Sequence, residues 1–173
     1  MPLGFENIIL FQITWLDAHN APIKNKIETI VETLEDGKRK TVRSILRLLM
    51  TRSHHNTSLT CEAQNCVESS PSTDSIILMV QFAPVVSVKQ TPVIIREGDT
   101  VIVRCQVTAN PHNITYQWFV GTREHQLGGE PGMLVLPGVG RDSHGWVVRC
   151  RASNSVGVSE ATITLNVTCE YTQ

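Results

Sequence analysis

The sequence predicts an all-β protein built of antiparallel β-sandwiches, and three observations support this fold class. Short runs of residues alternate between apolar and polar side chains, as strands with one buried and one solvated face do. Gly, Pro and Asn separate these runs, which is the composition of turns. Cys105, Trp118 and Cys150 fall on inward-facing positions of three such runs. Together these observations predict two packed sheets joined by a disulfide.

The size and charge of the chain limit what it can be. Its 173 residues suit one large or two small domains, and its net charge is −1. A chain so close to neutral offers no broad basic surface for nucleic acid. No stretch approaches the roughly 20 apolar residues that cross a bilayer. The first residues, MPLGFENIILFQ, lack the basic start and cleavage site of a signal peptide, so we expect a fragment or a sequence cut at its front.

In the first half, the strongest local signal is a β-hairpin. The stretch ETIVETLEDGKRKTVRSILRLL contains Asp36-Gly37, a dipeptide typical of hairpin turns, with Val, Thr and Ile on both sides. A helix is the competing interpretation, and we predict two strands and a turn.

In the second half, four runs alternate with period two. Each predicts a strand that turns one face towards a core. The inward sets are Val101, Val103, Cys105 and Val107; Ile114, Tyr116, Trp118 and Val120; Trp146, Val148, Cys150 and Ala152; and Ala161, Ile163, Leu165 and Val167.

The two cysteines of the second half are predicted to bond to each other. Side chains on facing sheets meet across a core about 10 Å thick, and the tryptophan packs beside the bridge. Closing a loop between Cys105 and Cys150 removes about 4 kcal/mol of unfolded-state entropy on the chain-entropy model.

The pattern Cys105…Trp118…Cys150-x-Ala-x-Asn154 resembles an immunoglobulin domain of the I-set or C2 type, over residues 84–168. One position departs from the family, because Val148 stands where its tyrosine corner would be. The resemblance implies a two-sheet sandwich with Trp118 in its core.

A second copy of this pattern precedes the first, with its elements in the same order. It consists of Trp15 as the third-strand tryptophan, Leu46 and Leu48 in a later strand, Leu59 and Cys61 in TSLTCEAQN, and a closing strand SIILMVQF. Only 14 residues precede Trp15 and none is a cysteine, so we expect this domain to lack its first strands and the partner of Cys61 to lie upstream. The expected domains are 1–82 (partial), 83–168 (complete) and a tail, 169–173.

Three Asn-x-Ser/Thr sequons indicate glycosylation in the secretory pathway, at Asn56, Asn113 and Asn166. Each falls on an expected loop or outward strand position. Cys66 and Cys169 are expected to be unpaired, with an extra bond within or between chains as the alternative.

Other candidate sites are interpreted as ordinary surface. Asp142, Ser143 and His144 are neighbours in a turn and point apart, so they cannot converge as a hydrolase triad. His54-His55 lacks further metal ligands. The run 38–40, KRK, is a solvated hairpin tip in preference to a heparan sulphate site. We therefore expect no enzyme activity, no cofactor, no metal site and no small-molecule substrate.

Details of both halves resemble the nephrin family, including its invertebrate members sticks-and-stones and hibris. They are HNTSLTCEAQN, the Ala109-Asn110-Pro111 turn before YQWF, and VVRCRASNSVGVSEA; Kirrel-type proteins share much of this. The resemblance implies a fragment of a cell-surface adhesion receptor with a single membrane span, whose internal domains act as spacers and lateral contacts. Its implied partners are other cell-surface immunoglobulin-superfamily proteins. The alternatives are a secreted or matrix scaffold and, less favoured, an enzyme or an intracellular filament domain.

Overall fold

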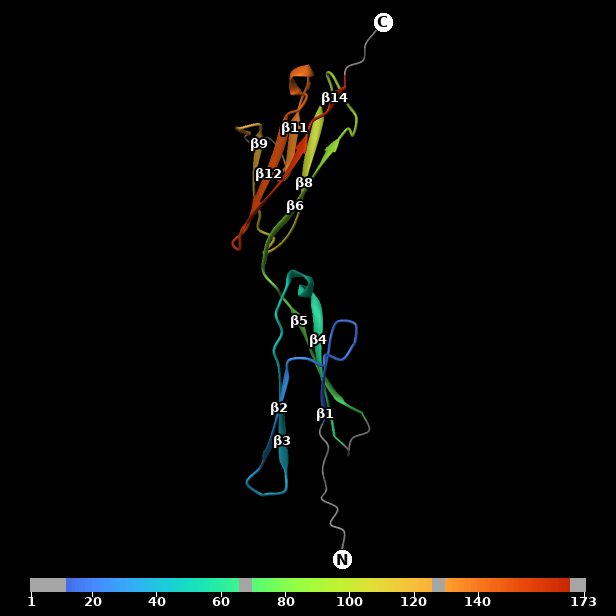
Figure 1. The fold of residues 1–173 in the computed structure, drawn as a ribbon, viewed down its shortest axis with the longest axis vertical. Helices are drawn as coiled ribbons and strands as arrows, with labels where there is room; N and C mark the ends of the chain where they lie inside the picture. Colours follow the sequence, from blue (N-terminus) through green and yellow to red (C-terminus); the bar gives the residue numbers. More distant parts are fainter. Residues whose placement is uncertain (1–11, 66–69, 126–129, 169–173) are drawn as a thin grey trace, which may run out of the picture. The chain divides into compact units, whose positions relative to one another are not determined.

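The computed structural model describes residues 12–65, 70–125 and 130–168 (Figure 1). It confirms the all-β prediction, because regular structure in these ranges consists of strands and two single-turn 3₁₀ helices. Contacts divide the chain into two compact units, Met1–Val80 (unit 1) and Gln81–Gln173 (unit 2). Within the described ranges, no helix has the length and hydropathy needed to span a membrane.

Unit 1 contains a three-stranded antiparallel sheet and a separate hairpin. The sheet has the order β1-β4-β5, and the hairpin pairs β2 with β3. The elements are β1 (Gln12–Leu16), β2 (Ile27–Thr33), β3 (Lys40–Leu46), the 3₁₀ helix η1 (Arg52–His54), β4 (Thr57–Gln64) and β5 (Ser72–Leu78).

The predicted hairpin is confirmed, with Asp36 at its turn. The Asp36 carboxylate accepts hydrogen bonds from the backbone N–H groups of Lys38 and Arg39, both at 3.0 Å, and pairs with the Arg39 guanidinium. Gly37 has a φ of +67°, a backbone conformation that is unfavourable for residues with a side chain. These donors, the Arg39 backbone N–H first, hold the pKa of the Asp36 carboxyl below its ordinary value.

Two boundaries in unit 1 differ from the prediction. β3 ends at Leu46, so Leu48 lies beyond the strand that was expected to contain it. β5 ends at Leu78, and Phe82 of the expected closing strand instead begins the first strand of unit 2.

Unit 2 is a sandwich of a four-stranded and a three-stranded antiparallel sheet, with a short parallel pair β14-β7 beside them (Figure 1). The orders are β10-β9-β12-β13 and β11-β8-β6. The elements are β6 (Phe82–Thr91), β7 (Ile95–Arg96), β8 (Val101–Asn110), β9 (Thr115–Val120), β10 (Arg123–His125), β11 (Met133–Leu136), the 3₁₀ helix η2 (Arg141–Ser143), β12 (Val147–Ser153), β13 (Val158–Thr164) and β14 (Val167–Thr168).

The core of unit 2 collects the inward positions of these strands. Buried members of the expected sets are Val101, Val103, Cys105, Trp118, Val120, Val148, Cys150, Ala152, Leu165 and Val167. The other expected members are partly buried, except one that is exposed. Trp146 precedes β12 and keeps 42% of its surface exposed, directly after Gly145 with its φ of +80°. The prediction that Trp146 packs in the core is therefore wrong.

Candidate functional site

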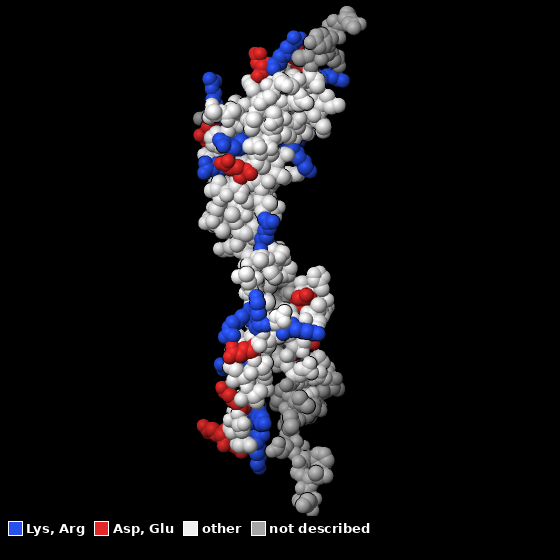
Figure 2. Space-filling view, in the orientation of Figure 1, with Lys and Arg blue, Asp and Glu red and all other residues white. Residues whose placement is uncertain are grey.

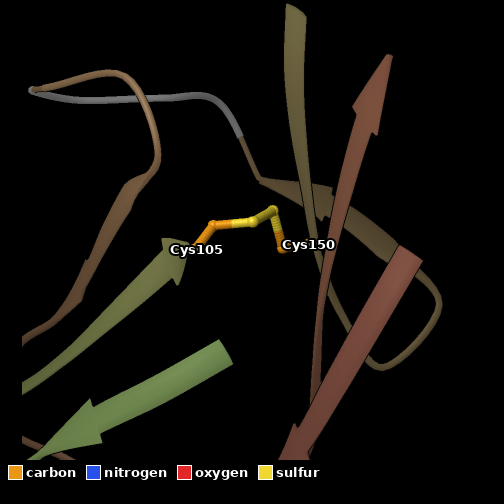
Figure 3. Close-up of a disulfide and its surroundings, with 2 residues drawn as sticks. All are labelled: Cys105 and Cys150. Carbon is orange, nitrogen blue, oxygen red and sulfur yellow. A yellow bond between two sulfur atoms is a disulfide. The ribbon is translucent and has the colours of Figure 1, made fainter. Parts of the chain in front are cut away.

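A disulfide joins the two sheets of unit 2, as predicted (Figure 3). Cys105 lies on β8 in the three-stranded sheet and Cys150 on β12 in the four-stranded sheet, with 6.2 Å between their Cα atoms. Trp118 of β9 stands directly opposite Cys150 in the β9–β12 ladder. The bridge and the indole therefore occupy the same level of the core.

The indole of Trp118 is completely buried. Its exposed fraction is 0%, and it belongs to the apolar cluster that contains both bonded cysteines. Its Nε1–H group finds no hydrogen-bond acceptor within the part of the chain that the structure describes. A buried donor without an acceptor costs about 1–3 kcal/mol. Trp118 thus stabilises the sandwich through its volume and apolar surface.

Unit 1 repeats the same cross-strand pair of tryptophan and cysteine. Trp15 of β1 stands opposite Cys61 of β4, as Trp118 stands opposite Cys150. Trp15 is half-buried, whereas Trp118 is fully buried, and the place of Trp15 in a core remains a prediction. Its Nε1–H donates a 2.9 Å hydrogen bond to the Ser44 hydroxyl on β3. This bond connects the three-stranded sheet to the hairpin.

Cys61 carries a free thiol, the only one on a cysteine within the described ranges. Cys66 and Cys169 lie outside those ranges. Partial burial, and then the negative charge of the Asp74 carboxylate across the β4–β5 ladder, raise the pKa of the Cys61 thiol above its ordinary value. The partner expected upstream for Cys61 remains a prediction.

The raised pKa predicts slow alkylation of Cys61. At pH 8 the thiol holds less thiolate than an unperturbed cysteine, and only the thiolate reacts. In a chain with Cys66→Ser and Cys169→Ser, we expect iodoacetamide to modify Cys61 severalfold more slowly than N-acetylcysteine. Adding Asp74→Asn should increase the rate, because it removes the repelling charge. A rate equal to that of N-acetylcysteine, measured by mass spectrometry, would contradict this prediction.

The motif Cys-x-Ala-x-Asn has a structural reason in unit 2. The Asn154 amide Nδ2 donates to the carbonyl oxygens of Phe82, at 2.9 Å, and Pro111, at 3.2 Å. Its Oδ1 accepts hydrogen bonds from the backbone N–H groups of Val156 and Gly157. One side chain thereby links the β12–β13 turn to the start of β6 and the turn before β9. The spacing from Cys150 singled out Asn154 in the sequence, but the sequence did not indicate its hydrogen-bond partners.

The three sequon asparagines, Asn56, Asn113 and Asn166, are all exposed. Asn56 has a φ of +60°, a conformation that asparagine tolerates better than most residues. The hydroxyl of Thr168, the third residue of the Asn166 sequon, donates to the Ile95 carbonyl oxygen at 2.8 Å. Glycosylation remains a prediction that these exposures permit.

The residues considered for catalysis lie in and directly after a 3₁₀ helix of unit 2. Asp142 and Ser143 lie in η2, Ser143 is buried, and the ring of His144 makes a hydrogen bond to the Val167 carbonyl oxygen at 3.1 Å. No group of three potential metal ligands occurs among the residues that the structure describes.

The outer face of the four-stranded sheet carries a network of paired charges. The guanidinium of Arg149 lies 4.5 Å from the centre of the Phe119 ring. Arg149 and Arg151 approach the Glu160 carboxylate at 3.6 and 3.5 Å. Over the face shown in Figure 2, the described basic and acidic side chains are interspersed, without a broad area of one sign.

Family comparisons match both units. A model of the family described as immunoglobulin domain matches residues 83–154, and a model of the CD80-like C2-set immunoglobulin domain matches residues 11–72. The crystal structure of the full ectodomain of mouse nectin-like molecule 4 is similar, with a TM-score of 0.78 and 25% identity over 95% of this chain and 56% of that one.

Curated relatives have the same character. The chain is 32% identical to the Drosophila melanogaster irregular chiasm C-roughest protein, over 90% of this chain and 23% of that protein. It is 30% identical to human cell adhesion molecule 4, over 83% of this chain and 38% of that protein. Human Kin of IRRE-like protein 1, a Kirrel-type protein, is 37% identical over 52% of this chain and 12% of its own length. The chain therefore spans well under half the length of each of these relatives.

Proposed function

We propose that this chain, which belongs to the immunoglobulin superfamily, is part of the extracellular region of a cell-surface adhesion receptor with a single membrane span. The observation that carries this proposal is that a tryptophan stands opposite a cysteine in both units. In unit 2 that cysteine also forms the disulfide of a sandwich core. The chain is, in addition, similar to cell adhesion molecules. Within that class we favour a receptor of the Kirrel type. The nephrin-type likeness remains a prediction.

In this proposal the two units act as spacers. The partners of the receptor are other cell-surface immunoglobulin-superfamily proteins, in homophilic or heterophilic contact. We assign lateral contact to the outer face of the four-stranded sheet. Its Arg149, Arg151 and Glu160 present both signs of charge, and its strands contain no sequon asparagine. Asn113 and Asn166 flank that sheet, in the segments before β9 and after β13. We propose no catalytic role and no cofactor.

Localisation of the native protein tests this function. Antibodies against residues 83–168 are applied to intact cells that express the protein, and then to permeabilised ones. We expect labelling of intact cells, concentrated where cells touch, and retention of the protein in membranes after a carbonate wash. Recovery from the medium would instead favour the alternative of a secreted or matrix scaffold. Labelling only after permeabilisation would contradict both. An N-glycosidase should increase the gel mobility of the protein, unless Asn56, Asn113 and Asn166 are replaced by Gln.

A further inference from the structure

A hollow with a volume of about 300 Å³ opens at the end of strands β9 and β10 in unit 2. It is lined by Val120, Gly121, Thr122, Arg123, His125 and Trp146. These residues belong to the β9–β10 hairpin and to the segment that enters β12. Of these residues, Val120 also belongs to the core that contains the disulfide, and none carries a charge of the outer face.

The hollow exists because nothing in the described part of unit 2 covers the inner face of β10. Arg123 pairs with Val120, and His125 pairs with Trp118. Cross-strand partners point to the same side of a sheet, so Arg123 and His125 share the inner face with two buried residues. They are nevertheless exposed. The inner face of this edge strand is thus open to solvent.

Trp146 forms an apolar wall of the hollow and is held by its backbone. Its N–H donates to the Ser143 carbonyl oxygen at 3.1 Å, and its carbonyl oxygen accepts from the Leu165 N–H at 2.9 Å. Its indole is 42% exposed. A large aromatic ring left partly in water on a fixed backbone is a ready surface for a ligand with one apolar face.

The charge of the lining is positive. Among the described lining residues, Arg123 and His125 are ionisable and none is a carboxylate. Glu124, which lies between them in sequence, pairs with Phe119 on the outer face and accepts a hydrogen bond from the Gln117 amide. A guanidinium without a competing acid in the hollow is suited to a carboxylate or a sulfate, which it binds with two parallel hydrogen bonds.

We propose that this hollow binds an anionic saccharide, with a sugar ring on the Trp146 indole and its carboxylate or sulfate on Arg123. A pyranose has a face of C–H groups that packs on an aromatic ring, while its hydroxyl groups stay solvated. A volume of about 300 Å³ is at the lower end for ligand sites, which fits one or two sugar rings. This binding activity goes beyond the adhesion role and does not depend on it.

The test is a titration of the full chain followed by the indole N–H signals in NMR spectra. The probes are 3′-sialyllactose, which carries a carboxylate, and a sulfated heparin disaccharide; lactose is the neutral control. We expect saturable shifts of the Trp146 signal with at least one anionic probe, which also identifies the preferred anion. The signals of Trp15 and Trp118 should stay in place. Equal shifts with lactose, or no shift at about 10 mM of either anionic probe, would overturn the proposal.

Variants separate a specific site from general attraction of charge. Arg123→Ala should weaken binding about tenfold or more, because it removes the paired hydrogen bonds to the anion. The matched control is Arg104→Ala, which removes an exposed arginine from β8 in the other sheet. It should leave binding unchanged, and equal weakening by both variants would contradict the site. An unchanged Trp118 signal verifies that each variant is folded.

Discussion

Replacing Cys105 with alanine is expected to lower the free energy of unfolding of unit 2 by about 2–5 kcal/mol. The bond it removes closes a separation of 45 residues and connects the two sheets at the centre of the core. Its loss frees the unfolded chain, and it also leaves the fully buried Cys150 facing a cavity. Equilibrium urea denaturation of the full chain, without reducing agent, measures the effect.

The chain supplies its own control for this experiment. Cys61 occupies the position in unit 1 that Cys150 occupies in unit 2, opposite a tryptophan, but its thiol is free. Cys61→Ala should therefore change the unfolding of unit 2 by less than about 0.5 kcal/mol. If Cys105→Ala had an effect as small as this control, the bridge would not contribute to the stability of the sandwich.

The sequence predicted unit 2 well because its long central strands, β8, β9 and β12, are buried on one face. Period-two alternation shows which side chains share a face of a strand, and unit 2 contains alternating strands from both sheets of its core. The Cys105–Cys150 bond followed from the same alternation. The hairpin of unit 1 was equally clear, because Asp36 and Gly37 meet the conformational demand of its turn by themselves.

The burial of a side chain also depends on which other elements pack against its face of the sheet. Alternation within one strand does not show this. Trp15 and Trp118 occupy the same position in their ladders, yet one is half-buried and the other fully buried. Trp146 follows the inward pattern of β12 but lies one residue before the strand begins, where it lines the hollow. The partners of Asn154 come from segments 43 and 72 residues away along the chain, and no local pattern indicates them.

Trp118→Ala is expected to have an effect of similar size, a loss of about 3–5 kcal/mol in the free energy of unfolding of unit 2. The indole is the largest fully buried side chain of the core, and its removal leaves a cavity beside the disulfide. The surrounding strands are tied by ladders on both sides of β9, so they have little freedom to close that cavity. Urea denaturation followed by circular dichroism measures the loss, because the variant lacks the tryptophan that fluorescence would report.

Trp118→Phe separates the two properties of the indole. Phenylalanine keeps most of the apolar volume and removes a buried N–H that has no acceptor among the described residues. The gain from losing that donor offsets part of the smaller volume, so we expect a loss of only about 1–2 kcal/mol. Trp15→Ala in unit 1 is the control, since it should leave the unfolding of unit 2 unchanged. If Trp118→Phe cost as much as Trp118→Ala, the N–H group would itself stabilise the core, and volume alone could not explain why a tryptophan stands opposite Cys150.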